Sequence, residues 1–504
     1  METLNGLLSW RYVPAAIALY FASLAFYRLF LHPLARFPGP KLAAITRYYE
    51  AYYDIVQNGQ YVFRVQDMHK KYGPIVRISP YELHVIDPAF FEKLYRQDGR
   101  WNKYDWAYDA FSAPGSTICA ADHDVHKARR LPLNPFFSKA KVSSRQVLIL
   151  QNVDRLCGRI SDFAVSKTAL SLGAAISAFT RDVATEFILG KSYNSLGQED
   201  FNAAMTTVFQ NSGHIWRITK HVRWFGPTMM SIPRAFIIKT ADEGTRGFFR
   251  YLNTLEIFLA SATFSSSTDD HSPPNVVHEI VKSDLPPADK SFERVRDDIG
   301  TITGASFETT ASVLRLIFFH VFSNAEILKR LRAELASAAA QSSGSLDLKM
   351  LEQLPYLTSI LMEGMRHSPA LATRLARIAP DRDLAYGQWR IPAGTPVGMT
   401  TLLMHMDETL YPDPKSFNPD RWMDLEVRKK AQKTYAPFSK GTRICLGMYL
   451  AWAEMYLVVA ALVQRFNFEF EDVTAEDFEC VSDQFVIGTR GQSILRALVT
   501  AYQG

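Results

Sequence analysis

The ten residues FSKGTRICLG, from Phe438 to Gly447, decide the fold of this 504-residue chain. They follow the pattern F-x-x-G-x-R-x-C-x-G, which is far more specific than a short glycine motif. A thiolate on Cys445 would be a soft anionic ligand that pushes electron density onto a haem iron and favours O–O cleavage. The stretch therefore predicts a haem-binding loop in which Cys445 is the metal ligand.

The other positions of the pattern fit this chemistry. Gly441 and Gly447 allow an unusual φ and a close approach of the backbone to a flat macrocycle, and backbone N–H groups near the sulfur stabilise its charge. Arg443 has a fork suited to a haem propionate, and Phe438 shields the sulfur from water. The alternative is that Cys445 is a small buried core residue, the commoner fate of an isolated cysteine.

The composition describes a chain that buries a sizeable core. Hydrophobic residues make up 47% and charged residues 21% of it, which is the balance of a globular protein. The net charge of +5 is too small to indicate nucleic-acid binding without a clustered basic stripe, so we expect no nucleic-acid partner. The four cysteines include no C-x-x-C pair, which argues against a zinc site and favours a reducing compartment.

Residues 13–31 read VPAAIALYFASLAFYRLFL, an apolar run interrupted only by Arg28. Its 19 residues are just long enough to span a hydrocarbon core as a helix. A cleaved signal peptide and a buried core helix are the alternatives. Basic residues follow the run, which disfavours a signal peptide and keeps the following body in the cytosol. We expect a membrane anchor over residues 1–32 and a catalytic domain over residues 33–504, with the helix-breaking FPGP at 37–40 near the boundary.

Most of the chain beyond residue 40 has helical periodicity. Apolar residues recur at spacings of three and four in three long stretches, 295–322, 327–335 and 448–466. Ser323 and Glu326 match a capping box and predict the start of a helix. Short β-like segments are 75–79, 83–86 and 389–391, and the loop-like segments are 265–275 and 341–345. The prediction is a mainly α fold with small β-sheets.

The cysteine loop resembles the signature of the cytochrome P450 family, and the resemblance extends over nearly the whole chain. A second family motif, E-x-x-R, is present as Glu363 to Arg366, about 80 residues before Cys445. Residues three apart share a helix face and can bond each other and a third partner. The resemblance implies that this partner is Arg421 and that the triad braces the cysteine loop. Taken alone, the pair would be an ordinary surface ion pair.

The resemblance also implies the P450 fold, with haem b as the cofactor. A third motif, GASFETT at 304–310, lies in the long predicted helix, and the family places Glu308 and Thr309 above the iron, opposite Cys445. A mid-helix threonine often bonds back to a carbonyl one turn earlier, and the acid and hydroxyl would relay protons to reduced oxygen. A buried helix run with an outward carboxylate is the alternative. The family usually has glycine at Ser306, whose hydroxymethyl group is expected to narrow the groove or add a donor.

Further haem contacts are implied by the same resemblance. His126 and Arg130 lie one helical turn apart where many relatives have W-x-x-x-R, and both are expected to reach a propionate. Arg377 resembles the later propionate-binding arginine of the family, whereas Arg374 is a candidate to face substrate. For each of these side chains the alternative is a solvated surface position.

The electron donor is expected to be another protein, because no Gly-rich fingerprint for a nucleotide or flavin is present. The resemblance implies NADPH-cytochrome P450 reductase, with cytochrome b5 as a second donor. It also implies a single pass through the endoplasmic reticulum membrane, with the catalytic domain facing the cytosol. The basic run VRKKAQK at 427–433 is expected to steer an acidic flavoprotein, although such a run is usually only a solvated face.

The expected activity is insertion of oxygen from O2 into a lipophilic substrate by hydroxylation or epoxidation. The chain resembles fungal secondary-metabolite P450s of the trichodiene oxygenase type, especially over residues 214–233, which implies a terpenoid or other lipophilic metabolite. The pocket-lining segments implied by the family topology are rich in apolar residues: 108–116, 209–236, 305–309, 370–374 and 483–486. An isomerase or dehydratase of the same fold that works without O2 is the alternative, which Glu308 and Thr309 disfavour. A non-catalytic haem-binding membrane protein is a third reading.

Overall fold

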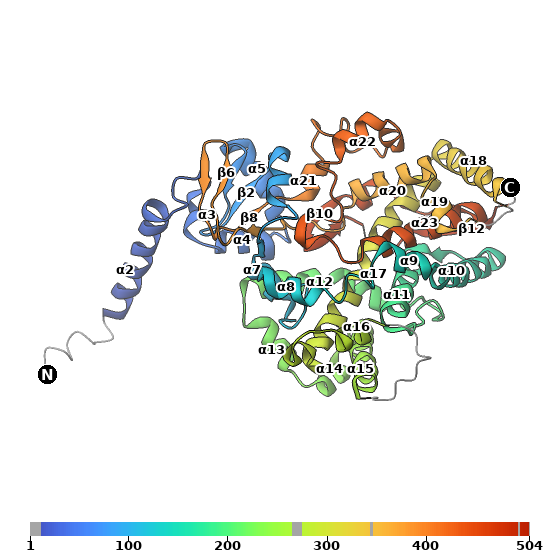
Figure 1. The fold of residues 1–504 in the computed structure, drawn as a ribbon, viewed down its shortest axis with the longest axis horizontal. Coiled ribbons are helices and arrows are strands. Elements are labelled where there is room, and N and C mark those ends of the chain that lie inside the picture. The colour runs from blue at the N-terminus through green and yellow to red at the C-terminus, as the bar shows by residue number, and fades with distance from the viewer. Residues whose placement is uncertain (1–11, 265–274, 343–345, 492–493, 503–504) are drawn as a thin grey trace.

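The computed structural model describes residues 12–264, 275–342, 346–491 and 494–502. The chain is mainly α with small sheets, as predicted (Figure 1). Its longer helices, in chain order, are α5 (Tyr61–Tyr72), α8 (His123–Arg130), α10 (Gln146–Ser166), α11 (Leu172–Leu189), α12 (Ala203–His221), α15 (Glu243–Phe264), α17 (Phe292–Ser323), α18 (Ala325–Gln341), α20 (Pro355–His367) and α23 (Met448–Arg465).

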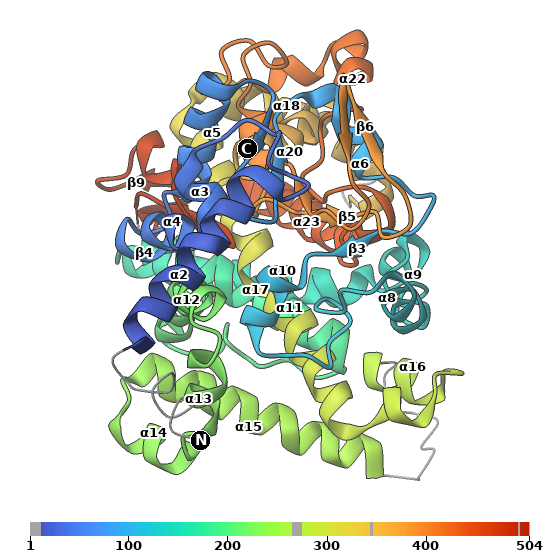
Figure 2. The same ribbon diagram turned by 90° about the vertical axis from the view of Figure 1, so that its left-hand side faces the viewer.

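Helix α17 crosses the middle of the molecule in both views (Figures 1 and 2). It packs against α11, which is buried along nearly its whole length, and against α15, α20 and α23. Apolar residues on several faces of these helices form one large core that extends from α10 to the C-terminal strands. Because α17 is central and buried, side chains in its middle turns are held in fixed positions.

The boundary between α17 and α18 differs in detail from the prediction. Asn324, and not Ser323, caps α18: its side-chain oxygen accepts from the backbone N–H groups of Glu326 and Ile327, both at 3.1 Å. Ser323 is the last residue of α17. The predicted capping box is therefore wrong by one residue, because asparagine is as good a cap as serine and the chain turns one position later.

The small sheets surround the helices. The predicted strands are confirmed as β1 (Ile75–Arg77), β2 (Leu83–Val85) and β7 (Trp389–Ile391). Strands β1 and β2 belong to a five-stranded sheet of order β1-β2-β8-β5-β3, completed by β8 (Val397–Gly398), β5 (Arg377–Ile378) and β3 (Asn102–Lys103), and β7 pairs with β6 (Leu384–Tyr386). A three-stranded sheet joins β4 (Leu170–Ser171), β12 (Arg496–Ala501) and β9 (Phe466–Phe470), and a hairpin joins β10 (Cys480–Gln484) and β11 (Val486–Thr489).

The N-terminal apolar run forms a helix that projects from the rest of the molecule (Figure 1). It comprises α2 (Val13–Phe26) and the π-helical turn η2 (Tyr27–Leu31), and its 19 residues are long and apolar enough to cross a membrane, with none of the span buried. This excludes the alternative of a buried core helix. Leu34 and Phe37, just beyond it, are buried in the cluster around the five-stranded sheet.

The two predicted loops are only partly covered. Residues 265–274 and 343–345 lie outside the described residues. At the end of the first loop, the Asn275 side chain caps α16 (Val276–Lys282) by accepting from the His278 N–H at 3.0 Å. Gln341 is not in a loop, because it is the last residue of α18.

Candidate active site

The cysteine loop leads directly into α23. Cys445 donates its backbone N–H to the Phe438 carbonyl at 3.0 Å, and Ile444 donates to the Gly441 carbonyl at 3.1 Å across the 3-10 turn η8 (Gly441–Arg443). Gly447 is the N-cap residue of α23. Cys445 therefore lies at a helix N-terminus, where free N–H groups and the helix dipole favour a negative charge.

The surroundings of the sulfur act on its ionisation in two directions. Part of Cys445 is exposed, yet protein atoms surround the sulfur densely enough that burial raises the pKa of the thiol. The Gly447 backbone amide and the Arg130 guanidinium oppose this rise. A bound metal would keep the thiol deprotonated, and the Gly447 amide and the Arg130 guanidinium would then stabilise the thiolate.

The two glycines of the loop have different roles. Gly441 has a φ of +77°, and a Cβ there would lie 2.5 Å from the Arg96 carbonyl oxygen, so the position requires glycine. Gly447 has a φ of −84°, and a Cβ there would contact no protein atom within 4 Å. The expected unusual φ is therefore right for Gly441 and wrong for Gly447. At Gly447 the small residue leaves space beside the loop instead.

Four cationic side chains gather near this loop from separate parts of the chain. Lys103, Arg377 and Arg443 are buried, and Arg130 is half-buried. Their hydrogen bonds go mainly to backbone carbonyls: Lys103 to Ile118 (2.5 Å), Arg130 to Ile444 (2.5 Å), Arg377 to Leu375 (3.1 Å) and Arg443 to Ala120 (2.7 Å). Within the described part of the chain, none of the four forms an ion pair with a carboxylate.

These cations destabilise one another's charged forms. Burial, followed by the charge of Arg377, lowers the pKa of Arg443 to about 9, and burial and then Arg443 lower the pKa of Lys103 well below its ordinary value. The Nε of Arg443 is buried without a hydrogen-bond partner among the described residues. Buried cations without an anion are costly, so this group fits a ligand with two negative charges, such as a haem with its two propionates.

Each predicted propionate contact has a definite place. His126 is buried on α8, and burial and then Arg443 lower its pKa to about 2, so its ring is neutral at pH 7. Arg377 lies in the cationic group, whereas Arg374, the candidate to face substrate, lies apart and binds Glu82 and Glu50. Lys103 was not predicted. Its only sequence signal is a lysine within the aromatic run WNKYDW.

The central helix presents one open face. Ala305 is exposed and Thr309 half-buried in the middle turns of α17, although Thr303, Phe307 and Thr310 of the same turns are buried, so this face is not covered by a neighbouring element of the described structure. The Thr309 hydroxyl donates to the Ala305 carbonyl at 2.8 Å, which confirms the predicted back-bond. The Ser306 hydroxyl donates to the Ile302 carbonyl at 2.9 Å. The extra donor of Ser306 is therefore used within its own helix.

Glu308 points toward α11. Its Oε2 accepts from Arg315 Nη2 at 3.0 Å, and Arg315 Nη1 donates to the Ser177 hydroxyl of α11 at 2.6 Å. No hydrogen bond joins Glu308 to Thr309 within the described ranges. The sequence prediction missed Arg315, although an arginine in an apolar helix seven residues after Glu308 lies on the same face and signals a buried partner.

The E-x-x-R motif forms a fully buried hub. Glu363 accepts from Arg366 Nε at 2.9 Å and Nη2 at 2.8 Å, from the Trp422 indole N–H at 2.7 Å and, more weakly, from Arg421 Nε at 3.5 Å. Although burial raises it, the hydrogen bonds from Arg366 hold the pKa of Glu363 well below its usual range. The predicted triad is confirmed.

A short chain of hydrogen bonds leads from this hub to the start of the cysteine loop. Arg366 Nη1 donates to the His405 carbonyl at 2.9 Å, and the ring Nε2 of His405 accepts from the Ala436 backbone N–H at 3.1 Å. Burial lowers the pKa of His405 to about 3. The ring is therefore neutral, which leaves Nε2 free to accept.

Comparisons with known proteins agree with this geometry. The sequence profile of the family described as Cytochrome P450 matches residues 51–496. The chain is 35% identical to the cytochrome P450 monooxygenase MO6277 of Ascocoryne sarcoides (93% of this chain, 94% of the relative). It is 36% identical to the tryptophan 6-hydroxylase fscE of Fusarium equiseti (92% and 91%). It is 33% identical to the cytochrome P450 monooxygenase TRI4 of Fusarium sporotrichioides (94% and 91%).

The fold and the site fit a haem-dependent oxidoreductase, and the chain belongs to the cytochrome P450 family. Its cofactor is haem b, and its activity is that of a monooxygenase. The predicted resemblance to fungal secondary-metabolite P450s is confirmed by these relatives.

Proposed function

We propose that this chain is a membrane-anchored monooxygenase that transfers one oxygen atom from O2 to a lipophilic secondary metabolite of the terpenoid class. Electrons come from NADPH through a separate reductase. The observation that carries the proposal is the placement of Cys445 at the N-terminus of α23, beside buried cations without carboxylate partners.

The haem contacts follow from this placement. Cys445 is the iron ligand, and Phe438, Gly441 and Gly447 shape the loop around it. The propionate-binding side chains are Arg443, Arg377, Arg130, the neutral His126 and, as an addition, Lys103. The bound haem supplies the redox chemistry that activates O2. The protein neutralises the propionates and keeps the thiolate at a fixed orientation.

Protons are proposed to reach the oxygen site through Thr309 and Glu308. The Thr309 hydroxyl lies on the open face of α17, where it can accept from a ligand, and it can donate to one once it releases the Ala305 carbonyl. Behind it, Arg315 Nε and two nitrogens of Arg181 are buried without hydrogen-bond partners among the described residues. Buried donors of this kind ordinarily bind ordered water. Waters beside Glu308 would connect its carboxylate to the α11 side, so the carboxylate and hydroxyl act as successive proton donors.

The wall of the pocket suits an apolar substrate. Phe485, at the tip of the β10–β11 hairpin, has its ring centroid 4.7 Å from that of Phe111, 5.4 Å from that of Trp216 and 6.1 Å from that of Tyr108. The nearby cations Lys220 and Arg374 are already paired with carboxylates. A further cation beside the wall, Lys103 at Tyr108, is assigned to the propionates, so the wall favours a neutral hydrocarbon skeleton over an amino-acid carboxylate.

A substrate panel tests this function. Ferric enzyme is titrated with sesquiterpene hydrocarbons, tryptophan and N-acetyltryptophan, and the Soret shift is followed. Turnover is then measured with and without NADPH and reductase. We expect a shift and oxygenated product with a terpenoid only, and only with NADPH. A shift confined to the tryptophans would contradict the substrate class. Product formed without NADPH would support the O2-independent alternative.

The redox partner is expected to dock on the side of the cysteine loop. Lys429 and Lys430, near the end of α22 (Leu425–Ala431), and Lys433 are exposed. Reversing these three lysines to glutamate should lower the rate of haem reduction by the reductase about 10-fold at low ionic strength, because attraction to an acidic flavoprotein is lost. The effect should shrink at high salt. Stopped-flow reduction under CO measures it.

The matched control reverses three exposed lysines on other elements, Lys167, Lys191 and Lys282. We expect this variant to be reduced at the wild-type rate. Equal rates for both triple variants would remove α22 from the docking site. The same assay with cytochrome b5 tests the second proposed donor.

The chain is proposed to divide into an anchor, residues 1–32, and a catalytic domain, residues 33–504, in the endoplasmic reticulum membrane. Four further helices have large apolar side chains exposed on them or next to them: α3 (Lys41–Ile45), α4 (Tyr48–Ala51), α13 (Phe225–Ser231) and α14 (Arg234–Thr240). The exposed side chains include Leu42 on α3, Tyr48 on α4, Trp224 just before α13 and Phe236 on α14. These helices lie on the side of the molecule from which α2 projects (Figures 1 and 2). Such a face would rest on the bilayer beside the anchor.

Protease treatment of intact microsomes tests this orientation. Because basic residues follow the apolar run, the catalytic domain should be digested without detergent while a short N-terminal fragment stays protected. A lumenal marker protein in the same vesicles controls for leakage. Protection of the whole chain would place the domain in the lumen and contradict the proposal.

A further inference from the structure

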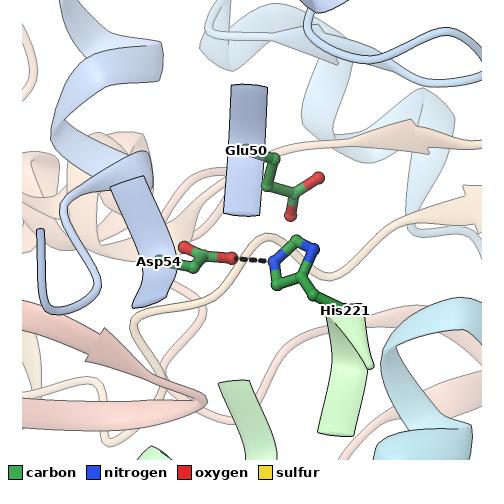
Figure 3. Close-up of side chains that lie close together, drawn as sticks. All are labelled: Glu50, Asp54 and His221. Atoms are coloured by element: carbon green, nitrogen blue, oxygen red, sulfur yellow. Dashed lines mark hydrogen bonds and ion pairs between the residues drawn. The ribbon is translucent and has the colours of Figure 1, made fainter. Parts of the chain in front are cut away.

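A buried cluster of charged side chains joins α12 to the N-terminal part of the fold. Lys220, in the last turn of α12, lies with its Nζ 3.0 Å from Glu50 Oε1 and 2.5 Å from Asp54 Oδ2. His221 Nε2 lies 2.8 Å from Asp54 Oδ2 (Figure 3). Glu50 is on α4, and Asp54 is on the following turn η3 (Tyr52–Val56). These four side chains are at most 3% exposed.

Two further elements join the same cluster. Arg374 donates to Glu50 Oε1 at 2.8 Å and to both oxygens of Glu82 at 2.7 and 2.9 Å. Arg217, one turn before Lys220, donates to the Asp483 carbonyl of the β10–β11 hairpin at 3.1 Å. The last turns of α12 are thus held directly by α4–η3 and by the hairpin, and Glu50 links them to the segment before β5.

The cluster is not arranged as a metal site. Glu50, Asp54 and His221 offer ligand atoms within 4.8 Å of one another. The ammonium of Lys220, however, already lies between the two carboxylates, and Arg374 contacts Glu50 from another side. Although burial lowers it, Asp54 and Glu50 hold the pKa of Lys220 above its ordinary value, so the ammonium stays charged. Lys220 is a cation tethered to α12, in the place that a free ion would take.

Stability alone does not account for this arrangement. A buried ion pair gains little over apolar packing, because both ions lose their hydration on burial. Glu50 Oε2 is buried without a hydrogen-bond partner among the described residues, so the network is not saturated. When two elements separate, however, released ions regain favourable hydration, whereas exposing apolar groups to water costs free energy. Ionic contacts therefore suit an interface between two elements that separate repeatedly and return each time to the same relative position.

The cluster lies at a place where a contact that opens repeatedly can act on ligands. A small cavity of about 10 Å³ lies beside it, with Lys220, Arg374, Thr373, Trp106 and Tyr108 among its lining residues. The ammonium of Lys103 lies 4.0 Å from the centroid of the Tyr108 ring. Lys103 is one of the side chains proposed to bind a propionate. The cluster thus lies beside Tyr108, which contacts one of the side chains that would hold a propionate, where α12 and the aromatic wall meet.

We propose that Glu50, Asp54, Lys220, His221 and Arg374 form a latch that closes the route of lipophilic ligands to the haem pocket. Ligands enter and leave when the last turn of α12 separates from α4–η3. The latch sets how fast ligands exchange, and it touches neither substrate nor iron. The inference rests on the proposed function only in that haem must occupy the pocket.

The test compares a bulky and a small haem ligand in stopped-flow experiments on full-length ferric enzyme. The bulky probe is clotrimazole, whose imidazole binds iron, and the small probe is cyanide. The double variant K220M/D54N removes one positive and one negative charge together. We expect its clotrimazole on- and off-rates both to rise about fivefold or more with a nearly unchanged Kd, because a gate alters both directions equally. Cyanide rates should not change.

The variants K220R and K70M/D67N serve as controls. Lys220→Arg keeps the tethered cation, and K70M/D67N makes the same chemical change in an exposed Lys–Asp pair, so both should match wild type. If the double variant does not retain haem, Asp54→Asn alone takes its place with the same expectation. Unchanged clotrimazole rates, or an equal rise for cyanide, would overturn the latch. Wild-type protein without haem would overturn the proposed function as well.

Discussion

Glu363→Gln should destabilise the protein by about 3–5 kcal/mol and prevent it from retaining haem. The carboxylate is fully buried and is the only acid within ion-pairing distance of Arg366 in the described structure. The neutral amide leaves that guanidinium buried without an anion, and the NH2 group of the glutamine must face donors such as the Arg366 and Trp422 N–H groups, from which it cannot accept. Because Arg366 also holds His405, which holds Ala436, the cysteine loop loses its brace. Urea unfolding and the haem content of the purified protein measure the two effects.

The stability lost in Glu363→Gln should also depend on pH. The folded-state pKa of Glu363 is depressed, so its contribution is fully present above the unfolded-state pKa of about 4.3 and is lost as pH falls below it. The difference between wild type and variant should therefore narrow below about pH 4. Asp67→Asn, which removes an exposed carboxylate paired with Lys70, is the control and should unfold like wild type. A haem-replete Glu363→Gln protein of wild-type stability would show that the hub is dispensable.

Thr309→Ala should lower product formation about 100-fold while NADPH consumption continues. The hydroxyl on the open face of α17 is the proposed last proton donor, and alanine removes it without disturbing packing, since Thr309 is half-buried and bonds only to its own helix. Electrons taken from NADPH are then released in hydrogen peroxide and are no longer used for O–O cleavage. The ratio of product to NADPH consumed, and the peroxide released, measure the effect with the substrate found in the panel.

Two variants sharpen this result. Thr309→Ser keeps the hydroxyl and should retain most of the coupling. Glu308→Gln keeps the shape of the acid but not its charge, and should slow product formation with a larger solvent isotope effect if Glu308 supplies the proton. If Thr309→Ala forms as much product per NADPH consumed as wild type, the proton comes from another donor.

Local sequence patterns predicted the features that depend on neighbouring residues. Helical periodicity placed both ends of α17 and α23 and the start of α18 within a few residues, but it ended α18 at Leu335 instead of Gln341. The same periodicity placed a helix just after Cys445. The errors were also local. The cap of α18 moved from Ser323 to Asn324, and Gly447 proved to have an ordinary φ, because turn geometry depends on where the chain must go next.

Contacts between residues far apart in sequence could be predicted only where a family motif identifies both partners. Arg421 was assigned to Glu363 in this way. Lys103 and Arg315 were missed, because a charged residue in an apolar run signals burial but not the identity of its partner. Lys220 and Glu50, which are 170 positions apart in sequence, carry no pattern that links them. Only the packing of α12 on α4–η3 brings them together.

The central claim is that Cys445 binds haem iron as a thiolate, and the CO spectrum of the dithionite-reduced protein tests it most directly. Wild type should show the strongly red-shifted Soret band that thiolate ligation gives. Cys445→His should retain haem and show the shorter-wavelength band of a histidine-ligated carbonyl complex. Cys119→Ser, which alters a buried cysteine outside the cysteine loop, should keep the wild-type band. The same Soret position in wild type and Cys445→His, or purified wild type without haem, would contradict the account.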